Sequence, residues 1–164
     1  MKPTIITSAE GGSFDFGGLG VNWKIDGAAT GQRFSVVHHP LAPRALAAPL
    51  HYHHNEDEYS FVLKGTLGAL LGDDVVTAGL GTWVFKPRKQ WHTFWNAGDT
   101  PAEIIEIISP AGFENFFREV AAHWGDLATF AAINQKYSLE MKFESVPELC
   151  QRFGLTFPDI ASHQ

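Results

Sequence analysis

Three histidines and one glutamate in this chain have the types and spacing of ligands to a single metal ion. His51 and His53 are separated by one residue, Glu58 follows His53 after four residues, and His92 lies in a later segment. Imidazole nitrogens and carboxylate oxygens bind Fe, Mn, Ni, Co, Cu and Zn in proteins. We therefore predict a centre that holds one divalent ion of this group through these four residues.

A β-strand is the element that would bring the first two histidines together. Side chains alternate between the faces of a strand, so His51 and His53 share a face, about 7 Å apart along the chain. The polar stretch 54–57 then supplies a turn, after which Glu58 begins a second strand. His54, Glu56 and Asp57 are interpreted as a solvated turn rather than as partners that orient the ligands.

The same alternation predicts the walls of a substrate pocket. Ser60 and Val62 share the face of Glu58, and Phe94 shares the face of His92. Trp91 and Trp95 face away from His92 and are expected in core or subunit packing. His38 and His39 lack matched spacing, so we expect them to have a surface or packing role.

The donor set favours a catalytic or ligand-binding metal over a structural one. Three nitrogens and one oxygen leave one or two open positions on a five- or six-coordinate ion. A structural zinc site would more often use cysteine and close all four positions. The chain has a single cysteine, Cys150, and it lies in the C-terminal part.

Up to about residue 109 the chain has the pattern of many short strands, typical of a sandwich or barrel. Gly72-Asp73-Asp74 predicts a tight hairpin turn. The predicted strands are 4–7, 23–25, 34–37, 59–63, 67–71, 83–85, 92–95 and 103–108.

After Gly112 the apolar spacing becomes helical. It predicts helices near 113–121 and 127–133, and a third that begins at Ser145 with a Ser-to-Glu148 capping box and ends at Gly154. We therefore divide the chain into a β-barrel, residues 1–112, and a C-terminal helical extension, residues 113–164, packed on the same domain.

Composition narrows the class of protein. At 164 residues, 45% hydrophobic and 18% charged, the chain reads as one globular domain. A formal charge of −6 argues against nucleic acid, which needs clustered Lys and Arg. No apolar run approaches the roughly 20 residues that cross a bilayer, so no membrane partner is expected. Because 1–4 lack a signal-peptide pattern and one cysteine suits a reducing compartment, we expect a cytoplasmic location.

The two ligand segments resemble the paired motifs of the cupin superfamily. The first matches from His51 to Gly65, with Ala45 in place of the leading Gly. The second matches from Gly81 to Asn96, with Lys89 in place of the middle Gly. The stretches 51–58, 61–65 and 109–117 look like small cupins related to quercetin 2,3-dioxygenase, and the resemblance covers roughly residues 30–120.

This resemblance implies an all-β double-stranded β-helix, the jelly-roll cupin barrel, with His51, His53, Glu58 and His92 as the metal ligands. We expect a metal-dependent dioxygenase-type oxidoreductase acting on a small enolisable or aromatic substrate. Glu58 would be both a ligand and the general base that takes the hydroxyl proton of the substrate.

Two alternatives stay open: a non-catalytic module whose metal holds a small molecule, and a metal-dependent isomerase or lyase. Sugar-phosphate isomerisation fits least, because the inferred inner face offers few cations. The outward aromatic side chains and the helical tail favour a homodimer.

Overall fold

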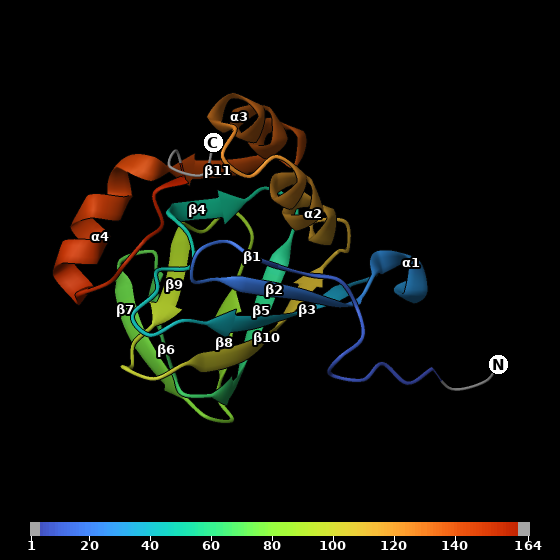
Figure 1. Ribbon diagram of the computed structural model, residues 1–164, viewed down its shortest axis with the longest axis horizontal. Helices are drawn as coiled ribbons and strands as arrows, with labels where there is room; N and C mark the ends of the chain where they lie inside the picture. The colour runs from blue at the N-terminus through green and yellow to red at the C-terminus, as the bar shows by residue number, and fades with distance from the viewer. Residues whose placement is uncertain (1–3, 161–164) are drawn as a thin grey trace.

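The computed structural model describes residues 4–160, and its strands form two antiparallel sheets that face each other as a barrel (Figure 1). In spatial order, the six-stranded sheet contains β1 (Ser13–Asp15), β2 (Gly20–Ile25), β3 (Ser35–Leu41), β10 (Ala102–Ser109), β5 (Asp57–Lys64) and β8 (Trp83–Lys86). The five-stranded sheet contains β11 (Leu139–Lys142), β4 (Leu50–His53), β9 (His92–Asn96), β6 (Thr66–Leu71) and β7 (Asp74–Gly79). The predicted all-β jelly-roll class is confirmed.

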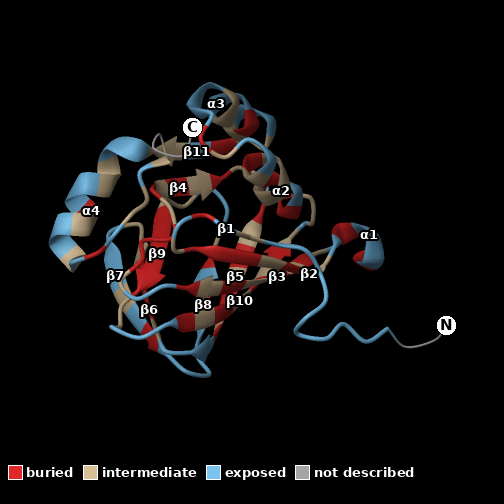
Figure 2. Ribbon diagram, viewed as in Figure 1, coloured by how far each residue is buried: buried red, intermediate tan, exposed pale blue. Residues whose placement is uncertain are grey.

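The barrel interior follows from strict alternation along the strands. In β10, every second residue from Ala102 to Ile108 is buried, and β5 buries every second residue from Glu58 to Val62. Figure 2 shows these buried positions concentrated on the strands of the barrel. Alternating apolar side chains from both sheets meet between them, and this contact removes their surface from water.

The hairpin predicted at 72–74 is present. Leu71 pairs with Asp74, so Gly72 and Asp73 form a two-residue loop between β6 and β7. Gly72 has a φ of 62°, a left-handed conformation that glycine adopts without the steric cost of a Cβ atom.

Four helices are described: α1 (Gly27–Thr30), α2 (Glu114–Ala122), α3 (Leu127–Lys136) and α4 (Val146–Phe153), the last preceded by a 3₁₀ turn, Phe143–Ser145. The three C-terminal helices agree with the prediction, and Gly154 ends α4 in a left-handed conformation. The predicted capping box is wrong, because Ser145 makes no side-chain hydrogen bond to the start of α4. The Ser145 hydroxyl accepts from the Leu50 backbone N–H and donates to the Lys142 carbonyl, so it ties the helix to β4 instead.

One predicted strand is absent, and three observed strands, β1, β7 and β11, were not predicted. Residues 4–7 are irregular and exposed rather than a strand. The larger difference is β11, which lies in the extension yet pairs with β4. Its register sets Leu139 opposite His53 and Met141 opposite His51. A tail that was expected to be helical therefore supplies the strand next to two predicted metal ligands.

The outer face of β9 is also covered. Trp95 is buried and stacks on Phe153 of α4 with ring centroids 4.4 Å apart. This stacking covers Trp95, which faces away from the barrel interior on a strand whose five residues are all buried. Among the described residues, no helix is long and apolar enough to cross a bilayer.

Candidate metal centre

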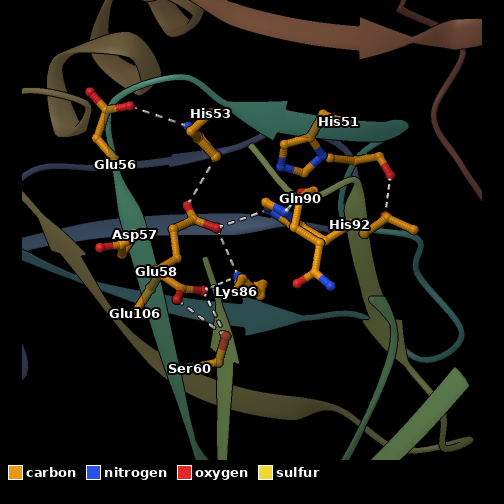
Figure 3. A network of polar contacts seen from close by, with 12 residues as sticks. His51, His53, Glu56, Asp57, Glu58, Ser60, Lys86, Gln90, His92 and Glu106 are labelled. Atoms are coloured by element: carbon orange, nitrogen blue, oxygen red, sulfur yellow. Dashed lines mark hydrogen bonds and ion pairs between the residues drawn. The ribbon is translucent and has the colours of Figure 1, made fainter. Parts of the chain in front are cut away.

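The four predicted ligands meet inside the barrel, and both sheets contribute. β4 supplies His51 and His53, β9 supplies His92, and β5 of the opposite sheet supplies Glu58 (Figure 3). One ligand atom from each lies within 4.8 Å of all the others, and all four residues are buried. Direct pairing of His51 with His92 across β4 and β9 aligns two of the imidazoles.

Two imidazole nitrogens at the centre have no hydrogen-bond partner. His53 Nε2 lies 3.4 Å from Glu58 Oε1 and His92 Nε2 lies 3.3 Å from Glu58 Oε2, but neither contact has the geometry of a hydrogen bond. Leaving a buried nitrogen unpaired costs free energy. Coordination to a cation removes that cost, so this arrangement fits a metal ion.

The outer nitrogens of two rings fix the tautomer. His51 Nδ1 donates to the Pro49 carbonyl at 2.8 Å, and His92 Nδ1 donates to the Gln90 carbonyl at 2.9 Å. A carbonyl oxygen only accepts, so Nδ1 carries the hydrogen in both rings. In the neutral imidazole the lone pair is then on Nε2, the nitrogen available to a metal ion.

His53 has a carboxylate instead of a carbonyl beside its outer nitrogen. Glu56 Oε2 lies 3.7 Å from His53 Nδ1, and Glu56 is only 8% exposed. The interpretation of Glu56 as part of a solvated turn is therefore wrong: its side chain folds in toward the ligand. Asp57 points outward and pairs with Arg88 at 2.7 Å, and the side chain of His54 is well exposed.

The charges inside the barrel favour the state that binds metal. Burial lowers the pKa of His51 well below its ordinary value, and burial likewise lowers the pKa of His92. For Glu58 burial acts to raise the pKa, but Lys86 and the neighbouring histidines outweigh it, and the pKa is lowered well below its usual range. Two neutral imidazoles and an ionised carboxylate are the forms that ligate metal.

Lys86 and Glu106 form a second buried cluster that the sequence reasoning missed. Lys86 Nζ lies 2.9 Å from Glu58 Oε2 and 2.8 Å from Glu106 Oε2, and Ser60 donates to Glu106 at 2.9 Å. Burial raises the pKa of Glu106 to about 7. Burial acts to lower the pKa of Lys86, but the carboxylates of Glu106 and Glu58 outweigh it, and the pKa of Lys86 is raised.

A sequence signal for these two residues did exist. Glu106 has the same strand parity as the apolar Ile104 and Ile108, and Lys86 has the parity of Val84. A charged residue on the inward face of a strand predicts a buried charge that needs a partner.

A cavity of about 50 Å³ adjoins the candidate ligands. Phe94 lines it, together with His39, Glu106 and Phe113. Ser60 and Val62 are fully buried and do not line this cavity, and the Ser60 hydroxyl donates to Glu106. Their role in a substrate pocket, like that of Phe94, stays a prediction.

His39, expected in a surface or packing role, is buried on the cavity wall. It donates from Nδ1 to the Gly20 carbonyl at 2.8 Å, and burial lowers its pKa to about 4.

Lys89, which stands where the second motif has a glycine, adopts a left-handed conformation. It has a φ of 64°, and its N–H donates to the His53 carbonyl at 2.7 Å. This bond connects the turn before His92 to the strand that carries His51 and His53.

Comparison with known proteins agrees with this architecture. Residues 37–108 match the cupin domain family. KdgF from Halomonas sp. has a similar structure, with a TM-score of 0.61 at 15% identity, covering 70% of this chain and 99% of that one. The barrel has the cupin fold.

Two further proteins are similar to part of this chain. A predicted oxalate decarboxylase from Thermotoga maritima aligns with a TM-score of 0.60 at 20% identity over 65% of this chain and 99% of that one. The xanthan biosynthesis protein XanB of Xanthomonas campestris is 32% identical over 84 residues, 51% of this chain. That region is only 18% of the length of the Xanthomonas protein.

Proposed function

We propose that this protein is a metal-dependent cupin that binds one divalent ion through His51, His53, Glu58 and His92 and acts as a dioxygenase on a small enolisable or aromatic molecule. The observation that carries the proposal is the pair of buried, unpartnered imidazole nitrogens that face Glu58. When bound, such an ion supplies open coordination positions for a substrate oxygen and for O₂.

The groups around the centre fix the orientation and charge of the ligands and give the cavity apolar walls. Pro49 and Gln90 carbonyls fix two imidazoles, and Lys86 keeps Glu58 ionised. Phe94 and Phe113 give the cavity apolar walls. The general-base role of Glu58 stays a prediction: its lowered pKa favours the ionised ligand and works against proton acceptance.

The charge of the cavity bears on the substrate class. Its described lining includes no lysine or arginine, and the nearby Lys86 is already paired with two carboxylates. A phosphate group needs free cationic donors. A flat neutral or singly charged molecule fits these walls better than a sugar phosphate.

A metal-dependent lyase is the second candidate. Two carboxylates, Glu58 and Glu106, line the cavity, and the pKa of Glu106 is raised to about 7. A group of that pKa exchanges protons near neutral pH, as decarboxylation and isomerisation require. The similarity to the Thermotoga protein points in the same direction.

Elemental analysis of the purified protein tests the metal centre, with His92→Ala as the site variant and His123→Ala, on the exposed end of α2, as the matched control. We expect near-stoichiometric metal in wild type and control and its loss in His92→Ala. Equal metal content in all three proteins would contradict the four-ligand centre.

Oxygen consumption then separates the two activities. The loaded wild type is mixed with a flavonol, a 1,3-diketone and a small dicarboxylate while dissolved O₂ and evolved CO₂ are recorded. Uptake of O₂ with an enolisable compound supports the dioxygenase. Release of CO₂ without O₂ uptake favours the lyase, and binding without turnover favours a non-catalytic module.

We further propose a homodimer formed through the outer face of β5 and β8. Tyr59 stacks on Phe85 at 4.9 Å and Phe61 packs on Trp83 at 4.7 Å. Trp83 and Phe85 remain 56% and 50% exposed, and β8 is an edge strand of its sheet. Exposed aromatic side chains in one patch at a sheet edge favour association with a like surface.

Light scattering at micromolar concentration tests this dimer. Wild type is expected at twice the monomer mass, Trp83→Glu at the monomer mass, and Leu127→Glu, an exposed apolar residue on α3, at the dimer mass. A monomeric wild type would remove the proposal.

A further inference from the structure

An apolar groove lies beside the cavity of the candidate metal centre. Its volume is about 80 Å³, and its walls come from the β1–β2 turn, the β3–β4 loop, α2, α3, β11 and the residues after α4. Every side chain that lines it is hydrophobic, including Phe16, Val120 and Phe130. Water in such a space finds few hydrogen-bond partners, so an apolar occupant is favoured.

The groove and the metal cavity share part of their walls. Phe116 and Phe117 of α2, Met141 of β11, Leu19 and Ala48 line both hollows. Met141 lies directly opposite His51 in the register of β11 with β4. The groove therefore begins within one side chain of a candidate metal ligand.

Met141 also borders the outside. It lines a third hollow, open at the surface between α3 and β11, next to Phe130 and Asn134. Methionine is unbranched and has three rotatable side-chain bonds, so it changes rotamer at little cost. The flexible side chain of Met141 therefore lines the surface hollow, the groove and the metal cavity.

We propose that the groove is a subsite for the hydrophobic tail of a ligand whose oxygen-bearing head is held at the metal centre, with Met141 at the boundary between head and tail. The ligand class is an amphiphilic small molecule: a carboxylate, enolate or phenolate that carries an alkyl or aryl tail. The placement of the head rests on the proposed function, whereas the apolar subsite itself does not.

A chain-length series tests the subsite. Co²⁺-loaded protein is titrated with acetate, butanoate, hexanoate and octanoate, and the visible spectrum of the ion reports binding. Each methylene that enters the groove is expected to tighten binding by about threefold to fourfold until the groove is full. Equal dissociation constants for acetate and octanoate would overturn the proposal.

Groove-filling variants locate the tail. Val120 lines the groove and not the cavity, so Val120→Trp is expected to abolish the gain with chain length while leaving the acetate constant unchanged. Ala47→Leu is a milder filling variant if the tryptophan prevents folding. Ala132→Trp, on the exposed side of α3, is the matched control and should retain the full gain. Octanoate binding unaffected by both filling variants would place the tail elsewhere and refute the subsite.

Metal-free protein separates this inference from the proposed function. Fluorobenzene, an uncharged probe, is titrated and followed by fluorine NMR. Binding that weakens at least tenfold in Val120→Trp supports the groove even if no carboxylate perturbs the Co²⁺ spectrum, an outcome that counts against the metal-held head alone. Absence of fluorobenzene binding to wild type would overturn the apolar subsite.

Discussion

Two buried polar clusters lie within a few ångströms of each other in this barrel, and they differ in how their atoms are paired. In the histidine cluster, His53 Nε2 and His92 Nε2 have no hydrogen-bond partner. In the Lys86 cluster, the ammonium group contacts Glu58 and Glu106, and it also lies 4.3 Å over the ring of Phe94. Glu58 belongs to both.

This difference separates a binding site from a structural element. A satisfied buried ion pair contributes to one fixed arrangement and has no free valence for a ligand. Converging unpartnered nitrogens are unfavourable by themselves and become favourable when a cation joins them. The neighbouring Lys86 cluster thus holds Glu58 in place, while the histidines supply the free electron pairs.

Breaking the satisfied cluster is expected to have the largest effect. Lys86→Met leaves Glu58 and Glu106 buried without a cation and should lower the free energy of unfolding by about 3–5 kcal/mol. Urea unfolding of metal-free protein measures it. The double variant Lys86→Met/Glu106→Met removes one of the two carboxylates as well, so it should recover the part of the loss that comes from Glu106 while Glu58 stays unpaired. A single variant as stable as wild type would show that the pair has no structural role.

Binding of a metal ion to the histidine cluster is expected to have the next largest effect on stability. At a metal concentration one hundred times the dissociation constant, wild type should gain about 2.7 kcal/mol in unfolding free energy. His92→Ala should gain almost nothing, while its metal-free stability stays near that of wild type. The comparison is made by urea unfolding of chelator-treated protein with and without added Co²⁺, and a similar gain in both proteins would refute the site.

His39, on the wall of the cavity that both clusters adjoin, should make stability depend on pH. Its pKa is about 4 in the folded protein and 6.5 ordinarily, so between these values the unfolded chain binds the extra proton. Stability is therefore lost as the pH falls from 6.5 toward 4. His39→Asn should reduce the loss between pH 7 and pH 5 by about 2 kcal/mol in metal-free protein. Identical pH dependence of both proteins in urea unfolding would contradict this.

The smallest expected effect comes from the carboxylate beside His53. Glu56→Gln keeps the size of the side chain but removes the charge beside His53 Nδ1. Metal affinity should fall about tenfold, since partners of ligating imidazoles typically contribute that much or more. Competition with a chelating dye measures it, and Asp57→Asn, which alters only the outward pair with Arg88, is the control that should leave affinity unchanged.

The alternation of residues along the strands gave most of the correct predictions about which side chains face the barrel interior. Alternation on β4, β5 and β9 predicted which side chains face inward, because a strand fixes which side chains share a face. The resemblance to the paired cupin motifs implied that His51, His53, Glu58 and His92 meet at one centre. The alternation rule applied to β10 indicates that Glu106 faces inward, and the partner it then requires is Lys86.

Other features depend on long-range contacts that no local pattern encodes. The inward fold of Glu56 depends on the turn between β4 and β5, and burial of His39 depends on α2, whose Phe117 ring lies 5.6 Å from it. The strand character of β11 is a tertiary effect, since its four residues extend only because the edge of β4 is there to pair with.

The pairing of β11 with β4 also orders events during synthesis of the chain. His51 and His53 leave the ribosome long before Leu139 and Met141, which complete their sheet. Contacts between such distant segments form late in folding, because a long loop must close first. A nascent chain that has already made both histidines, Glu58 and His92 still exposes the open edge of β4, so metal capture before release would take place on an unfinished barrel.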